Sequence, residues 1–256
     1  MRKALAYLAF LTAVPCHAQL VTYQGIAYDP DEGDVLYSEN HYLLMDTAGL
    51  PTERVVLYRC PEGPAFARKV MQIGGNELRP SFEMTDARLN YIEGYDRGQD
   101  SDLVYVQRQG ERESEMLQVG KEAVADAGFD AFVRQNWDEL QSGDSVRFEF
   151  LVPSRLSVMD FKVYKLRDER VAGNPASTFR LNLSGVLGWF VSGLEVTYRD
   201  SDRALLRFEG LSNVRDPDGD NYIARIEFGD ASRLDNADPA LINDARTEPL
   251  VTRCAP

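Results

Sequence analysis

The stretch Tyr222-Ile-Ala-Arg-Ile-Glu-Phe228 places an apolar residue at every second position. Tyr222, Ala224, Ile226 and Phe228 therefore share one face of an extended strand, opposite the two charged residues. The nearby stretch Ala204-Leu-Leu-Arg-Phe-Glu209 has the same period. A sheet with one buried and one solvated face is typical of antiparallel pairing, so these two stretches predict an antiparallel sheet.

Similar short segments run from residue 20 to about residue 119, separated by turns rich in Gly, Pro and Asp. The turns fall at residues 29–34, 47–49, 61–64 and 74–75, and one long segment covers residues 35–45. Strands are expected again at residues 145–152, 161–166, 178–183 and 194–198. We therefore predict a mainly β fold: a curved antiparallel sheet, or incomplete β-barrel, with one main α-helix packed on it.

The helix is expected at residues 127–141, where the period of the apolar residues changes. The residues that repeat at helical spacing are Phe129, Phe132, Val133, Trp137 and Leu140. Asp126 is the expected N-cap and Gly143 the expected stop. An aromatic stripe of this kind is more often core than ligand contact, so the helix is predicted to cover one face of the curved sheet.

The N-terminus has the order of a secretory signal peptide. Arg2 and Lys3 precede an apolar run over residues 4–14, which leads to a small-residue site ending at Ala18. We expect cleavage after Ala18, which removes residues 1–18 and exports the chain to the periplasm. Residues 19–256 are then expected to form a single β-rich domain without a transmembrane segment.

Two further expectations concern the chain ends. Cys16 has an alternative role as the acylated cysteine of a bacterial lipoprotein, but Pro15 stands where such signals carry a small residue. From about residue 229 the sequence predicts an irregular tail, with one short helical turn near residues 239–245.

The net charge and the cysteine content indicate which partners and which covalent bonds to expect. The net charge of −13 repels phosphate backbones, so nucleic acid is not an expected partner. Cys60 and Cys254 remain after cleavage, and an oxidising compartment favours a structural disulfide between them. Two unpaired buried thiols are the alternative, because sequence alone does not place the two residues close together.

No sequence motif identifies a chemistry, and we assign no catalytic residue, cofactor or metal ligand. His41 is the histidine left after cleavage, and we interpret it as a solvated strand residue rather than a catalytic base. Asp216, Asp218 and Asp220, with Glu227 further on, have some of the spacing of a calcium loop. The glycine lies at the wrong position for an EF-hand, so a tight hairpin turn is the favoured interpretation.

Trp189-Phe190 lies in the most apolar stretch of the mature chain. It is expected to be a core strand with glycine ends, and the alternative is the lining of an apolar pocket.

Three stretches carry a resemblance to known sequences. They are Gly49-Leu-Pro-x-x-Arg54-x-Val-x-Tyr58, Phe150-Leu-Val-Pro153-x-Arg155-Leu156 and Gly210-Leu-Ser-Asn213. With them the chain resembles uncharacterised β-rich exported proteins of Gram-negative bacteria. In layout it is similar to the half-barrels of periplasmic lipoprotein carriers, which implies an apolar cavity for acyl chains, although no functional residue of such carriers is matched.

These observations favour a non-enzymatic periplasmic protein that binds a lipid or other hydrophobic molecule in the cell envelope. One alternative is an interaction or structural module with a filled core, and another is a glycan hydrolase that uses a pair of carboxylates. An outer-membrane barrel is disfavoured by the charged, irregular ending at residues 251–256.

Overall fold

The computed structural model describes residues 18–184 and 193–255. The strands are β1 (Gln19–Tyr28), β2 (Val35–Met45), β3 (Pro51–Arg59), β4 (Ala65–Gln72), β5 (Ser81–Asp86), β6 (Tyr91–Asp96), β7 (Asp102–Arg108), β8 (Glu111–Leu117), β9 (Val124–Ala125), β10 (Ser145–Val152), β11 (Ser157–Val171), β12 (Asn174–Leu183), β13 (Leu194–Arg199), β14 (Leu205–Arg215), β15 (Asn221–Phe228) and β16 (Leu234–Ala237). The α-helices are α1 (Gly128–Gln135), α2 (Trp137–Gln141) and α3 (Ala240–Thr247), and two short 3-10 helices are η1 (Pro153–Arg155) and η3 (Asp230–Ser232).

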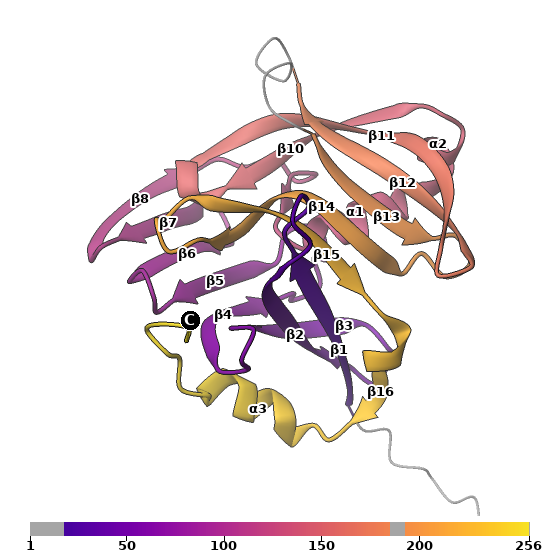
Figure 1. Ribbon diagram of the computed structural model, residues 1–256. Helices are drawn as coiled ribbons and strands as arrows, with labels where there is room; N and C mark the ends of the chain where they lie inside the picture. The colour runs from indigo at the N-terminus through magenta and orange to yellow at the C-terminus, as the bar shows by residue number, and fades with distance from the viewer. Residues whose placement is uncertain (1–17, 185–192, 256) are drawn as a thin grey trace, which may run out of the picture.

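All the described strands belong to one curved, unclosed sheet (Figure 1). Its order is β8-β7-β6-β5-β4-β3-β2-β1-β15-β14-β13-β12-β11-β10-β9, and β16 pairs with β1 beside this path. Two antiparallel meanders, β1 to β8 and β10 to β15, are joined where β1 pairs with β15. At this join Gly25 faces Phe228 and Tyr28 faces Arg225. The predicted mainly β fold with a curved antiparallel sheet is confirmed.

Agreement between expected and observed strand bounds varies along the chain. The expected segments at residues 35–45 and 145–152 have the same bounds as β2 and β10. The expected strand at residues 161–166 was too short, because β11 extends through charged residues. Ion pairs with strands further along the sheet hold this charged end, with Arg167 binding Glu195 of β13 and Arg207 of β14 binding Glu169.

The predicted helix lies on the inner face of the curve, over the strands of the second meander. Phe132 contacts Phe148 with ring centroids 4.4 Å apart, and Trp137 meets Phe179 edge-on at 5.2 Å. The buried side chains of this first core are Val124, Phe129, Phe132, Val133, Trp137, Leu140, Phe148, Val163, Phe179, Leu181, Val196 and Tyr198. The aromatic stripe is therefore core, as expected.

Two details of this helix differ from the expectation. It is divided at Asn136 into α1 and α2, and the Asn136 side chain donates to the Phe132 carbonyl, ending the first segment. Asp126 is not its N-cap, because its φ is +46° and its carboxylate binds Lys69 instead. The cap position is Ala127, which makes no side-chain cap.

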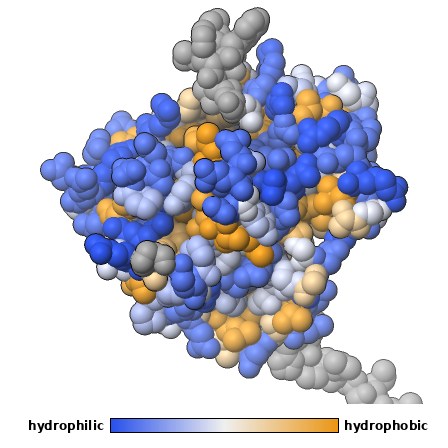
Figure 2. Space-filling view, viewed as in Figure 1, coloured by the Kyte–Doolittle hydropathy of each residue, from blue (hydrophilic) through white to orange (hydrophobic). Residues whose placement is uncertain are grey.

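The outer face of the first meander is covered by α3. Ile242 and Ala245 are buried there against Leu20, Val55 and Leu57 of the sheet. The tail beyond residue 229 is thus less irregular than expected, since it forms η3, β16 and α3. The helical turn expected near residues 239–245 is an eight-residue helix. In the view of Figure 2 the surface is mostly hydrophilic, with apolar residues gathered in patches.

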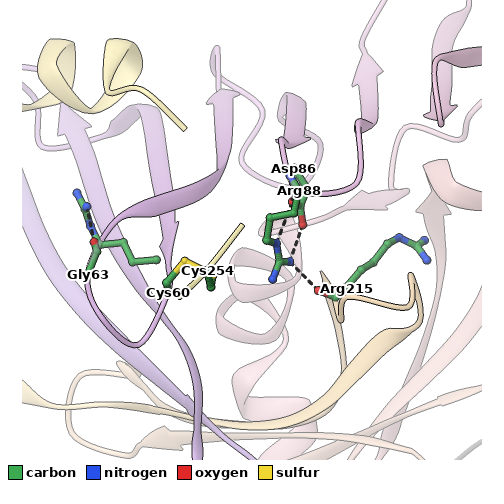
Figure 3. The surroundings of a disulfide bond; sticks show 7 residues. Cys60, Gly63, Asp86, Arg88, Arg215 and Cys254 are labelled. Carbon is green, nitrogen blue, oxygen red and sulfur yellow. Dashed lines mark hydrogen bonds and ion pairs between the residues drawn. A yellow bond between two sulfur atoms is a disulfide. The ribbon is translucent and has the colours of Figure 1, made fainter. Parts of the chain in front are cut away.

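A third core seals the join between the two meanders. Tyr37, Val56, Tyr58 and Phe66 come from the first meander, and they pack with Val214, Ala224 and Ile226 of the second. We call this set the seam cluster. Beside it, Arg88 Nη2 donates to Asp86 at 2.7 Å and to the Arg215 carbonyl at 2.6 Å (Figure 3).

The C-terminus is fixed to the edge of the seam cluster. Cys60 and Cys254 form a disulfide with their Cα atoms 5.5 Å apart, which is the pairing that the sequence favours (Figure 3). Arg59 binds both carboxylate oxygens of Glu248 at 2.7 Å, and Val251 N–H donates to the Ala65 carbonyl. Among the helices described, none combines the length and hydrophobicity of a membrane span.

Replacing both cysteines should lower the free energy of unfolding of the oxidised protein by about 2–5 kcal/mol. The reason is that the bond links residues 194 apart in sequence and restricts the unfolded chain. Urea unfolding of Cys60→Ser/Cys254→Ser against the wild type, each with and without reductant, measures this. Reductant should destabilise the wild type and leave the variant unchanged; equal stability of the two oxidised proteins would contradict the prediction.

Candidate functional site

The inner face of the first meander carries ionisable side chains where a core would be apolar. Strand alternation and register bring them to one face, next to the charged side of α1. We call this set the inner cluster: Tyr23, Glu39, His41, Arg54, Tyr58, Lys69 and Glu93 from the sheet, and Asp126, Asp130 and Arg134 from α1 and the residues before it.

His41 is buried, in contrast to the solvated residue expected from the sequence. Its position in a strand is as expected, but the odd-numbered residues of β2 face inward. His41 Nε2 lies 3.0 Å from Glu39 Oε2, and since a carboxylate only accepts, the ring donates its Nε2–H. The ring stacks on Tyr23 with centroids 4.4 Å apart. Burial lowers the pKa of His41, so the neutral form is favoured.

Lys69 and Asp126 form an ion pair that fixes the start of α1 to β4. Lys69 Nζ lies 2.7 Å from each carboxylate oxygen, and both side chains are largely buried. A backbone hydrogen bond supports the same junction, since Ala125 N–H donates to the Leu78 carbonyl. Gly128 is required there, since a Cβ atom would lie 1.9 Å from the Leu78 oxygen.

The charged side of α1 is a feature that sequence reasoning missed. Asp130 and Arg134 are four residues apart and share one side of α1, and Asp126 lies four residues before Asp130 in the segment that leads into the helix. Asp130 accepts a hydrogen bond of 2.7 Å from the Tyr198 hydroxyl and lies 3.7 Å from Arg134. The spacing was visible in the sequence, but it is also the pattern of an ordinary solvated face.

Glu93 on β6 is a buried acid of the inner cluster. Burial raises the pKa of Glu93, and the Tyr91 hydroxyl donates to its Oε2 at 2.7 Å. Each acid of the inner cluster thus has its own bonded partner: Glu39 has His41, Glu93 has Tyr91, Asp126 has Lys69 and Asp130 has Tyr198. No two of them form the free facing pair that glycoside hydrolysis uses.

Arg54 differs from the other charged residues of the inner cluster. Its side chain is half-buried, and within the described residues it has no hydrogen bond and no ion pair. Its Nε is inaccessible to solvent and without a partner. Asp126 and Asp130 attract it electrostatically, but both are bonded elsewhere.

Beside the inner cluster, a row of half-buried apolar side chains crosses the inner face of the second meander. Strand register places them on the same face as the first core, on which three of them pack. The members of this apolar row are Phe161 on β11, Leu194 on β13, Phe208 on β14 and Phe228 on β15. Phe208 contacts both the first core and the seam cluster, so the row reaches the join between the meanders.

Two other candidate sites came from the sequence, the carboxylate-rich segment at residues 216–220 and the apolar pair Trp189-Phe190. The carboxylate-rich segment is a hairpin turn between β14 and β15, where Asp216 accepts backbone N–H bonds from Asp218 and Asp220. In the described part of the chain, no group of three or more His, Cys, Asp and Glu residues is arranged to hold a metal ion. Trp189-Phe190 lies outside the described residues.

On the outer face, a shallow hollow of about 280 Å³ lies between the sheet, η3 and α3. Its lining residues include Thr22, Gln24, Asn40, Tyr42 and Leu241. Tyr23, His41 and Ser232 also line it, and the lining mixes polar and apolar surface in similar amounts, so the hollow does not match an apolar cavity of the kind expected from the sequence.

No protein-family model and no curated protein matches the chain. Among solved structures, it is similar to a putative outer membrane lipoprotein-sorting protein domain from Vibrio parahaemolyticus. The identity is 7%, the match covers 89% of this chain and 88% of that one, and the TM-score is 0.27. The two proteins are therefore remote from each other in both sequence and coordinates.

Stability should fall as the pH drops below about 6.5, the ordinary value of histidine. The folded pKa of His41 is lowered, so the unfolded chain takes up the proton first and the stability present above pH 6.5 is lost on acidification. Urea unfolding between about pH 7.5 and 5.5 should show a slope that His41→Gln reduces. Glutamine is chosen because it retains an N–H donor for Glu39. The same slope in both proteins would refute this role of His41.

Lys69→Met should destabilise the protein by about 3–5 kcal/mol, because it leaves the Asp126 carboxylate buried and unpaired. The double variant Lys69→Met/Asp126→Asn should be more stable than the sum of the single changes predicts, because it leaves no unpaired charge. Asparagine is chosen because it tolerates the positive φ of this position. A double-mutant cycle by urea unfolding measures the coupling. Additive effects would show that the pair does not anchor α1.

Proposed function

We propose that this chain is a non-enzymatic periplasmic protein that binds a lipid or other hydrophobic molecule on its inner face. The observation that carries the proposal is the apolar row, whose side chains are directed to the concave side yet are only half-buried. Large apolar side chains that keep accessible surface on a concave face are typical of ligand-binding sites.

The dimensions of the apolar row suit an extended acyl chain. Neighbouring strands lie about 4.8 Å apart, so the four steps from β11 to β15 span roughly 19 Å. Each methylene group buried along that path contributes about 0.8 kcal/mol. The charged and bonded groups of the inner cluster lie beside the row and limit where an apolar chain can run.

Export is part of the same proposal. The leader-like N-terminus supports it, and the disulfide between Cys60 and Cys254 is typical of proteins in an oxidising compartment. A periplasmic location also places the protein among lipids and lipidated molecules. Purified protein from the periplasmic fraction should begin at Gln19, as read by N-terminal sequencing.

One specific observation favours a second function, an interaction module with a filled core. Helices α1 and α2 already occupy much of the inner face over the second meander, and their contacts are dense and aromatic. In that case the half-buried row would be the margin of a core, and no apolar ligand would bind. The same experiment decides between the two.

We expect the uncharged probe N-phenyl-1-naphthylamine to bind the protein with increased fluorescence, and Leu194→Gln to weaken that binding about tenfold. The loss follows from removing a leucine contact worth about 1.5 kcal/mol or more. Leu211→Gln is the matched control, because Leu211 is exposed on the outer face of the adjacent strand β14. An absence of probe binding to the wild type, or an equal effect of both variants, would overturn the proposal.

A further inference from the structure

We propose that the hydrophobic ligand carries an anionic head group, a carboxylate or a phosphate, which Arg54 and Tyr23 bind at the end of the apolar row. This inference rests on the proposed function and adds the chemical class of the ligand. It is built from three neighbouring residues on the inner face, Tyr23 of β1, His41 of β2 and Arg54 of β3.

Strand register brings the three residues together. Tyr23 is the cross-strand partner of His41, and their rings are stacked 5° from parallel. Val56 is the partner of His41 on the next strand, and Arg54 is two residues from Val56 on the same face. The Tyr23 phenol, the His41 ring and the Arg54 guanidinium are therefore adjacent on one surface.

These side chains retain unused hydrogen-bonding groups. Within residues 18–184 and 193–255, the Tyr23 hydroxyl has no hydrogen-bond partner, and neither does any nitrogen of Arg54. His41, which is only 8% exposed, leaves Nδ1 buried and unpaired, but this nitrogen is an acceptor because the ring donates through Nε2–H, so His41 positions Tyr23 rather than binding the anion. Burial raises the pKa of Tyr23, so its hydroxyl remains a donor at neutral pH. A buried donor without a partner, such as Arg54 Nε, is costly in a folded protein, and a bound acceptor removes the cost.

The surrounding charges leave Arg54 as the cation available for an anion. Lys69 is neutralised by Asp126, which binds it through both oxygens. Arg134 lies 3.7 Å from Asp130, and Glu39 is bonded to His41. Arg54 faces this network without joining it. Guanidinium groups bind carboxylate and phosphate through two parallel hydrogen bonds, and the gain is larger away from bulk water.

The apolar row begins next to this site. The Phe228 ring lies edge-on to Tyr23 at 6.2 Å and to His41 at 5.8 Å. Gly25 permits this position, because a Cβ atom on it would lie 2.6 Å from the Phe228 ring. An amphiphile with its head group on Arg54 thus has its first methylene groups against Phe228 and the rest along the row.

The test is displacement of N-phenyl-1-naphthylamine by three ligands with the same alkyl chain: dodecanoate, dodecyl phosphate and dodecanol. Wild-type protein should prefer either anion over the alcohol by about tenfold or more, as expected for charge-assisted hydrogen bonds. Arg54→Gln should remove the preference while leaving the affinity for dodecanol within about twofold. Arg54→Lys, which keeps the charge, should retain part of it, and Tyr23→Phe should reduce it.

Arg225→Gln is the matched control, because Arg225 lies on the outer face of β15 beside Glu227. It should keep the full preference, and thermal melting confirms that each variant is folded. If the wild type binds dodecanol as well as the anions, the head-group inference fails while the proposed function stands. If neither the probe nor any of the three ligands binds, the proposed function itself fails. Inorganic phosphate alone should not compete; competition equal to that of dodecyl phosphate would show a free-anion site and overturn the inference.

Discussion

The pairing of β1 with β15 is the contact on which the curved sheet depends. Each of the two meanders is built from local hairpins, whereas this join connects strands about 200 residues apart in sequence and is registered over only four residue pairs from Gly25 to Tyr28. Closing so long a loop costs conformational entropy that local hairpins do not pay. The seam cluster supplies the compensating burial, since its side chains come from both meanders. The disulfide between Cys60 and Cys254 lies in the same region and lowers the entropy of the unfolded chain. The inner face exists only because this join is made.

Helix α1 forms a second connection between the meanders, of a different physical kind. Its aromatic side packs on the second meander, where Asp130 also binds Tyr198, and Asp126 just before the helix binds Lys69 of the first meander. A buried ion pair such as Lys69–Asp126 gives little net stability over an apolar replacement, but breaking one side of it is expensive. Such contacts therefore specify where the helix sits more than they stabilise it. The positive φ of Asp126 fits this role, because a backbone in that region persists only when its surroundings fix it.

Local sequence patterns predict the strands and the residues that share a face, but not the contacts between residues far apart in sequence. The bounds of β2 and β10 were predicted to the residue, and helical spacing identified the aromatic stripe of α1. The charged end of β11 was missed because cross-strand ion pairs, which sustain it, join residues far apart in sequence. Alternation also shows which residues share a face without showing which face is inward when polar residues occupy both. His41 was for this reason assigned to solvent, and the inner cluster was not predicted. The pairing of Lys69 with Asp126, across 57 residues, had no local signal.

The inner cluster contains two kinds of buried charge, and the difference between them bears on function. Lys69, Asp126, Glu39 and Asp130 each have a bonded partner, and these bonds offset the energetic cost of burying them. Arg54 has none within the described residues, although apolar or smaller side chains would fit the inner face of a β-strand at lower cost. Sequences that specify a stable fold avoid unpaired buried groups except where function requires them. An arginine held open beside a stacked Tyr–His pair, at the end of a row of half-buried aromatic rings, is such an exception. Under the proposed function, the desolvation cost of Arg54 is recovered only when an anionic ligand binds, so this residue would contribute little to stability and much to the choice of ligand.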